Sequence, residues 1–341
     1  MARLTHRRWT VTAAMTLAAG IALAGCSVSS TPAGEGTTAP GADSDGTYVV
    51  GISGANYAIE GARAQYEALA AGLIEAGIEV KFLDAALDIN AQVSQVDQFI
   101  DQGVDAIVLN LAGDPNAIQG SLQRATDAGI DLYSIGGTGN DDVLVQVDLP
   151  STELGELSGH YMCEQTGGTG EIALIEAVDI PVLAERWDAF LNTIEAECPD
   201  LEIVARERAI PDDAATARPI AEDLLTRFPN LTAMWTMGDG PALGAGLAVQ
   251  ASGRDVIVTG LNAESQGIDG IRQGAIHATW DLEPTEIGLQ LADRIIAIVD
   301  GSSPRPTQTE VFTVTDLAEW TTDNVDDWVA YDARVTFPGI N

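Results

Sequence analysis

The residues best suited to bind a small polar molecule directly follow predicted strands. They are Asn56 after the apolar run 48–52, Asp239 after 233–236, and Asn262 after 256–260. Because open α/β sheets bind ligands at the carboxyl ends of their strands, we expect these side chains at a ligand site. An amide donates and accepts hydrogen bonds and a carboxylate accepts them. Such a set suits a ligand that carries hydroxyl groups.

Each candidate also has an ordinary structural role open to it. Asn56 could form a turn that caps the next helix, and Asp239 could be a helix N-cap. Arg186, which lies among apolar residues near a predicted helix start, could hold a ligand or pair with an acid such as Asp239. Tyr57 could offer its ring to a ligand or cover the core, and Trp280 could line the pocket or fill the core.

No recognisable catalytic pattern accompanies these residues. Neither Gly-x-Ser-x-Gly nor Gly-x-Gly-x-x-Gly follows any predicted strand. His160 and His277 have no Ser, Cys or Asp partner in a known arrangement, and no Cys-x-x-Cys or His/Cys cluster suggests a metal. We therefore predict a binding protein with no cofactor and no metal, and not an enzyme.

The elements that must position the candidates alternate between strands and helices. A first series has strands at 48–52, 78–83, 106–109, 130–135 and 143–147, and a second has strands at 171–176, 201–205, 233–236, 256–260 and 278–280. Residues with helical spacing separate most of these strands, and glycines such as Gly77 end the helices. Two such series predict an α/β fold of two doubly wound, parallel-sheet lobes.

The segments of the two lobes interleave along the chain. The first break falls near 148–151, and the helix that starts at Pro284 has no place in the second series. We expect the following division: an N-terminal lobe of 47–149 plus 283–309, a C-terminal lobe of 150–282 plus 310–318, and an acidic C-terminal tail of 319–341. The sequence does not assign a structure to this tail.

The first 26 residues predict export and lipid attachment. Three arginines in residues 1–8 precede a short apolar stretch at 9–23, and Leu-Ala-Gly leads directly to Cys26. This ending resembles a bacterial lipobox, in which the cysteine takes the lipid; the alternatives are an uncleaved anchor or a chance cysteine. Residues 27–46 are predicted as a flexible tether. Lipidated Cys26 would hold the protein at the outer face of the cell membrane.

Charge and cysteine content limit the partners. The formal net charge is −35, which repels nucleic acid and anionic membrane surfaces. The acidity suits a solvated acidic surface, or alternatively a cationic ligand. In an exported protein Cys163 and Cys198 could form a disulfide, because the helices that they end could share one face of the sheet. They could instead be two separate core residues.

Several short patterns, taken in order along residues 47–315, resemble the periplasmic sugar-binding proteins of the ribose-binding type. The patterns are an opening strand with an Asn-containing loop, Glu185-Arg186-x-x-x-Phe190, Asp239-x-x-Ala242-Leu243-Gly244-Ala245, Val258-x-Gly260-x-Asn262, and Ala278-Thr279 followed by Pro284 and Ile287-Gly288. The resemblance implies the type 1 periplasmic-binding-protein fold, with two lobes that close on a ligand about a hinge of three crossings. It also implies a monomeric, lipid-anchored receptor that delivers its ligand to the membrane permease of an ABC transporter.

The resemblance places Asn56, Arg186, Asn262 and the loop at Asp239 in the pocket, with some departures from the sugar binders. An Asp-Arg pair becomes Gly136-Gly137, an aromatic pair becomes Ala58-Ile59, the Asn beside Asp239 becomes Gly238, and the usual Asp becomes Asn262. Because sugar pockets rely on bidentate polar groups and stacking aromatics, we expect a sugar-like or polyol ligand other than a plain pentose or hexose. The alternative is a receptor that presents a non-sugar molecule to a membrane sensor.

Replacing Cys26 with Ala should release the protein from the membrane, because the variant has no thiol to carry the lipid. Membrane fractionation of cells that produce wild type and variant would measure this. A Cys26→Ala variant that stays in the membrane fraction as firmly as wild type would contradict the lipid assignment.

Overall fold

The computed structural model describes residues 46–176, 181–315 and 317–340. The predicted signal, nearly all of the predicted tether, and Cys26 lie outside these residues. Within the described residues, no helix is both long and apolar enough to cross a membrane.

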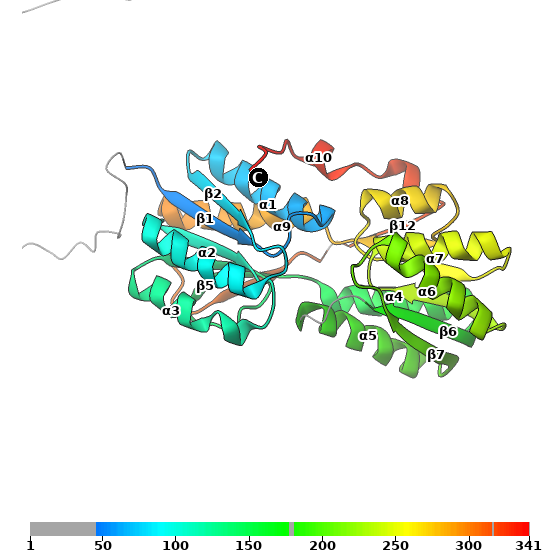
Figure 1. The fold of residues 1–341 in the computed structure, drawn as a ribbon. Coiled ribbons are helices and arrows are strands. Elements are labelled where there is room, and N and C mark those ends of the chain that lie inside the picture. The colour runs from blue at the N-terminus through cyan, green and yellow to red at the C-terminus, as the bar shows by residue number, and fades with distance from the viewer. Residues whose placement is uncertain (1–45, 177–180, 316, 341) are drawn as a thin grey trace, which may run out of the picture. The chain divides into compact units, whose positions relative to one another are not determined.

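The first sheet is parallel and has the strand order β11-β5-β4-β3-β1-β2 (Figure 1). Its strands are β1 (Val49–Gly54), β2 (Glu79–Asp84), β3 (Ala106–Asn110), β4 (Asp131–Ile135), β5 (Val143–Asp148) and β11 (Glu310–Thr313). β1 is buried along its whole length, as a central strand of a parallel sheet should be.

Helices cover both faces of this sheet. α1 (Glu60–Glu75) and α9 (Pro284–Val299) share one apolar core with the sheet, and α2 (Ile89–Gln102) and α3 (Gln119–Asp127) share another. A short 3-10 turn, η1 (Pro115–Ala117), precedes α3. The helix predicted after Pro284 therefore belongs to the first lobe, as its absence from the second series suggested.

The second sheet has the order β12-β10-β9-β8-β6-β7 and is parallel apart from β12. Its strands are β6 (Thr169–Glu176), β7 (Asp200–Arg208), β8 (Leu231–Thr236), β9 (Ile257–Thr259), β10 (Ala278–Asp281) and β12 (Ala318–Thr321). The helices α4 (Ser151–Thr166) and α5 (Pro181–Glu197) cover one face, and α6 (Ala214–Arg227), α7 (Asp239–Ser252) and α8 (Ser265–Arg272) cover the other.

The chain passes between the two sheets three times, after β5, after β10 and after β11. The predicted fold of two doubly wound lobes is confirmed. The segment boundaries differ at one point: residues 310–318 were expected in the second lobe, but β11 pairs with β5 of the first sheet. The strand is short and its alternate residues are exposed, so its sequence pattern does not identify the sheet that it joins.

The tail, whose structure was not assigned from the sequence, is ordered through residue 340. After β12 it forms η2 (Val325–Asp327) and α10 (Tyr331–Arg334), and residue Ile340 packs against the apolar core of the first lobe. β12 pairs antiparallel with β10, the strand that carries Trp280.

α4 and α5 are in close backbone contact where α4 has glycine. A Cβ atom on Gly155 would lie 2.2 Å from the carbonyl oxygen of Arg186, a separation that no side chain tolerates. At the far ends of the same helices Cys163 and Cys198 form a disulfide, with their Cα atoms 5.6 Å apart. The predicted pairing is confirmed, and it fixes the helix that carries Arg186.

Removing this disulfide should cost about 2–4 kcal/mol of unfolding free energy, since it closes a loop with a sequence separation of 35 residues. Denaturant melts of the Cys163→Ala/Cys198→Ala variant, with and without reductant, measure the loss. Reduced wild type serves as the control and should match the variant. Two titratable thiols in unfolded, non-reduced wild type would contradict the bond.

Candidate functional site

Arg186 and Asn262 meet at the carboxyl end of the second sheet. Nη1 of Arg186 lies 3.1 Å from Oδ1 of Asn262 and 3.4 Å from the carbonyl oxygen of Met237, to both of which it donates. The arginine is only 2% exposed, and its Nε has no hydrogen-bond partner. The guanidinium is therefore a buried group whose main task is to hold the loop after β9.

The loop after β9 has an uncommon backbone. Asn262 and Ala263 both have positive φ, +98° and +53°, values that cost energy for residues with a side chain and that concentrate at functional sites. Two amide donors fix the loop to β10: the N–H of Asn262 reaches the carbonyl of Trp280 at 3.0 Å, and the N–H of Ala263 reaches Oγ1 of Thr279 at 3.1 Å.

Asp239 holds the same loop from the other side. Its carboxylate accepts hydrogen bonds from the N–H of Glu264 and from Oγ1 of Thr279, each at 2.7 Å. It is 1% exposed and is the first residue of α7, after the N-cap Gly238. Asp239 therefore does not cap the helix with its side chain, and its burial does not favour the predicted ligand contact.

The charges around Arg186 form a coupled set. Burial lowers the pKa of Arg186 to about 10, and the carboxylates of Asp212 and Asp239 oppose that shift. Burial, and then Glu264, raise the pKa of Asp212 to about 6, while Arg186 acts to lower it. Burial also raises the pKa of Asp239 and of Glu264. Asp212 is exposed as a whole residue, but its carboxylate lies against Gly238. Its Oδ2 would be 3.1 Å from a Cβ atom placed on Gly238.

On the first-lobe side a cavity of about 180 Å³ opens at the ends of β3, β4 and β5. Its lining residues are Asn110, Leu111, Gly113, Ile135, Gly136, Gly137, Gln146, Asp148, Leu149 and, from α5, Glu185. Nε2 of Gln146 donates to Oδ1 of Asp148 at 2.6 Å. The volume is small beside the ~300–1,000 Å³ of sites for drug-sized ligands, so it suits a small molecule.

Sequence reasoning missed the polar groups of this cavity. Gln146 and Asp148 lie near the end of β5, the same strand-end signal that selected Asn262, and Asn110 ends β3. The Nδ2 of Asn110 donates to the carbonyl of Ile135 at 2.9 Å and its Oδ1 accepts from the hydroxyl of Tyr66 at 2.6 Å. Asn110 is thus fixed in place by its neighbours.

Of the first-lobe candidates, Asn56 remains partly exposed and Tyr57 turns toward the core. Oδ1 of Asn56 accepts from the N–H of Ala58 at 3.0 Å. This bond forms the turn that was the structural alternative to ligand contact for Asn56. The Tyr57 hydroxyl donates to Glu67, and its ring centroid lies 5.2 Å from that of Phe82. Burial and the Glu67 bond raise the pKa of Tyr57 to about 12.

Trp280 is a core residue. Its side chain is 0% exposed, packs edge-on against Tyr161 with ring centroids 5.5 Å apart, and donates from Nε1 to Glu319 at 3.1 Å. The prediction that Trp280 contacts ligand is therefore not supported. The polar partner on β12 allows a large indole to be buried completely.

Two helices of different lobes cap each other. Glu60, the first residue of α1, accepts from the N–H and Oγ of Ser265 at 2.9 and 2.5 Å, and Glu264 accepts from the N–H of Gly61 at 3.1 Å. Neither helix has a side-chain cap from its own N-cap residue. Acids at a helix start normally suit their own helix, so sequence alone does not indicate this exchange.

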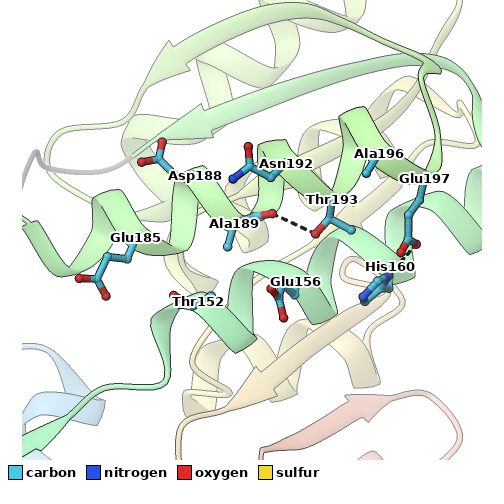
Figure 2. A pocket seen from close by; sticks show the side chains of 10 residues that line it. All are labelled: Thr152, Glu156, His160, Glu185, Asp188, Ala189, Asn192, Thr193, Ala196 and Glu197. Atoms are coloured by element: carbon cyan, nitrogen blue, oxygen red, sulfur yellow. Dashed lines mark hydrogen bonds and ion pairs between the residues drawn. The ribbon is translucent and has the colours of Figure 1, made fainter.

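A second, wider depression lies between α4 and α5. Figure 2 shows it lined by side chains of both helices, with His160 Nδ1 2.7 Å from Glu197 Oε2 at one end and Glu185 at the other. It is an acidic groove that contains none of the predicted ligand residues. Among the described residues no group of three or more His, Cys, Asp and Glu side chains could hold a metal ion.

Comparison with known proteins identifies the family of this chain. The family described as periplasmic binding protein domain matches residues 50–303. Over 154 residues the chain is 27% identical to the ribose import binding protein RbsB of Bacillus subtilis, covering 45% of this chain and 49% of that relative. The chain thus matches about half the length of this curated relative.

Solved structures agree over most of the chain. A sugar ABC transporter subunit from Rhodobacter sphaeroides is 26% identical with a TM-score of 0.72, and the match covers 81% of this chain and 99% of that one. A solute-binding protein from Bacillus halodurans with bound myo-inositol is 24% identical with a TM-score of 0.72, covering 82% and 96%. The latter likeness shows the fold, and the ribose-type resemblance drawn from the motifs is confirmed.

Replacing Arg186 with Ala should lower the free energy of unfolding by about 1.5–3 kcal/mol, because it removes the charged donor to Asn262 and to the Met237 carbonyl and a positive charge that acts on Asp212 and Asp239. Denaturant melts measure the loss, and Arg186→Ala/Asp212→Asn should recover part of it. A loss below about 1 kcal/mol would mean that water reaches the guanidinium.

Asp212→Asn should stabilise the protein at pH 8 and not at pH 4. The folded-state pKa of Asp212, about 6, lies above the ordinary 3.8, so the protonated form is favoured in the folded state. That stabilisation is fully present below pH 3.8 and is lost as the pH rises through 6. Since the residue is exposed, we discount the gain at pH 8 to about 1 kcal/mol.

Asp213→Asn is the matched control for the pH prediction. Hydrogen bonds from Thr216 lower the pKa of Asp213, so removing its charge should give no gain at pH 8. Thermal melts of both variants from pH 4 to pH 8 distinguish the two carboxylates. Equal behaviour of the variants would contradict the shift at Asp212.

Proposed function

Because this chain belongs to the periplasmic binding protein family and resembles its ribose-binding type, we propose that it is an extracytoplasmic solute-binding protein of an ABC importer. It binds a small sugar-like or polyol ligand between its two lobes. The observation that carries this proposal is the polar cavity at the ends of β3, β4 and β5, which Glu185 of the other lobe also lines.

The chemistry of the cavity favours a polyhydroxylated ligand. Asn110 and Gln146 supply amide groups, and Asp148 and Glu185 supply carboxylate acceptors. A hydroxyl group donates to such a carboxylate and accepts from such an amide. None of the described residues that line the cavity is aromatic, so recognition relies on hydrogen bonds more than on stacking. That balance favours a polyol or a modified sugar over a plain aldose.

The relatives support the same class of ligand. One is named for ribose import, and one solved structure holds myo-inositol. Both molecules are small rings that carry hydroxyl groups. Their names describe transport binding proteins, which favours binding and delivery over catalysis for this chain.

The proposal extends to the surroundings of the protein. Lipid on Cys26, supported by the lipobox, would hold the chain at the outer face of the membrane, where it would pass ligand to a permease as a monomer. No observation among the described residues favours the alternative of a receptor for a membrane sensor.

Calorimetric titration should find binding of myo-inositol or another polyol that is tighter than binding of the plain aldoses D-ribose, L-arabinose and D-allose. Native mass spectrometry of freshly purified protein should reveal any retained ligand. Asp148→Asn should weaken binding about 10–100-fold, the equivalent of a charge-assisted hydrogen bond of ~1.5–3 kcal/mol. The exposed Asp142, just before β5, provides the control: Asp142→Asn should bind as wild type does.

Two results would count against the proposal. Binding of none of these compounds, with no retained small molecule, would remove the sugar-like ligand. Binding that Asp148→Asn leaves unchanged would move the ligand away from this cavity.

A further inference from the structure

The C-terminal segment, residues 322–340, connects the two lobes outside the three sheet crossings. Val325 is 4% exposed in the core beneath α6–α8, and its carbonyl accepts from Nη2 of Arg272 at 3.2 Å. At its other end Ile340 packs against the core that α1 and α9 form. Figure 1 shows the segment in red, with α10 on its path and the C-terminus beside α1. The segment therefore has one anchor on each lobe.

In the second lobe the segment holds the loop of Asn262. Tyr331 is 2% exposed, and its hydroxyl lies 2.7 Å from the carbonyl oxygen of Asn262 and 3.1 Å from that of Ala263. These are the two loop residues with positive φ. The hydroxyl is a buried donor directed at the backbone of the residue whose side chain accepts from Arg186.

At the second crossing between the sheets the segment supplies a cation. Nη2 of Arg334 lies 2.6 Å from Oδ2 of Asp281, and Nη1 lies 2.9 Å from Oε2 of Glu283. The guanidinium also lies over the Tyr331 ring, 4.8 Å from its centroid. Asp281 is 0% exposed, so Arg334 compensates a buried charge at the hinge and fixes Tyr331 at the same time.

In the first lobe the segment ends on the carboxylate that also holds Tyr57. Glu67 is 1% exposed and accepts from the Tyr57 hydroxyl, from the N–H of Gly339 at 2.9 Å and from the N–H of Ile340 at 3.4 Å. Among the described residues no basic side chain forms an ion pair with Glu67. A buried carboxylate needs hydrogen-bond donors, and the segment supplies two of them, the amides of Gly339 and Ile340. These donors hold Glu67 in position, and Glu67 in turn holds Tyr57 and its loop.

We infer that residues 331–340 are a positioning element for two strand-end loops, one in each lobe, whose neighbours line the proposed ligand cavity: the segment fixes the Asn262 loop through Tyr331 and the Asn56–Tyr57 loop through Glu67. The effect on ligand affinity rests on the proposed function. The contacts between the segment and the two loops do not depend on it.

The two loops belong to different lobes, and neither lines the cavity assigned to the ligand. The Asn262 loop is bonded to Arg186, the chain neighbour of the lining residue Glu185. The loop that begins at Ala55 is bonded to Tyr66, which donates to the lining residue Asn110. The residues of the segment need not touch the ligand to control affinity.

Two variants separate the two anchors. Tyr331→Phe removes one hydroxyl and keeps the ring under Arg334. A stop codon after Arg334 removes residues 335–341, and with them the amides on Glu67, while it keeps Tyr331 and Arg334. Tyr133→Phe is the matched control, since Tyr133 is also fully buried but its hydroxyl has no hydrogen-bond partner.

Amide hydrogen exchange of the ligand-free protein is the first measurement. In Tyr331→Phe the amides of Ala263 and Glu264 should exchange about tenfold faster, whereas the core amides of β6 should not change. In the truncated chain the amide of Tyr57 should show the same local increase. A purely structural loss of stability would instead raise exchange throughout the second or first sheet, and Tyr133→Phe should leave the loop amides unchanged.

Calorimetric titration with D-ribose and myo-inositol is the second measurement. For whichever compound binds wild type, Tyr331→Phe and the truncation should each weaken binding about fivefold or more, and Tyr133→Phe should not. If both compounds fail to bind wild type, the proposed ligand class loses support and the exchange data still decide the role of the segment. Unchanged loop exchange in both folded variants, or faster exchange with unchanged affinity, overturns the inference.

Discussion

The buried carboxylate of Asp239 sets the geometry of the second lobe's ligand edge. It accepts from the backbone of Glu264 and from Thr279, so it joins the start of α7, the loop after β9 and strand β10. A buried charge is tolerated only when donors and counter-charges surround it, and Arg186 provides the nearby positive charge. Arg186 in turn fixes the side chain of Asn262, and its own position depends on the contact between α4 and α5.

Small residues make that arrangement possible. Gly155 allows the backbone of α4 to approach the Arg186 carbonyl, and Gly267 of α8 leaves room for the Asp239 carboxylate, whose Cγ would lie 2.3 Å from a Cβ on Gly267. The Cys163–Cys198 disulfide closes the other end of the α4–α5 pair. The ligand edge of the second lobe is thus a rigid assembly, whereas the first lobe presents an open cavity beside Gly136 and Gly137.

Local patterns allowed much of the fold to be predicted. Apolar runs and helical spacing located the strands and helices. The family resemblance grouped Arg186 with Asn262, and the two side chains are in contact. The burial of Asp239 and Trp280 could not be predicted, because it depends on partners far along the chain, such as Thr279, 40 residues from Asp239. The ordered tail was missed for the same reason: Tyr331 bonds backbone carbonyls about 69 residues away, and no side-chain pattern encodes such a partner.

The exchanged caps of α1 and α8 link lobe motion to the solvation of helix ends. If the lobes separate, Glu60 and Glu264 leave the other helix at the same moment, and both N-termini expose amide groups that had partners. Each lost bond is worth about 0.5–1.5 kcal/mol net. The exchanged caps therefore slightly favour contact between the two lobes even without ligand. Dissolved anions bind at free helix N-termini and would stabilise the state in which the lobes are separated. The equilibrium between separated and contacting lobes in the ligand-free protein should therefore depend on the anions in solution.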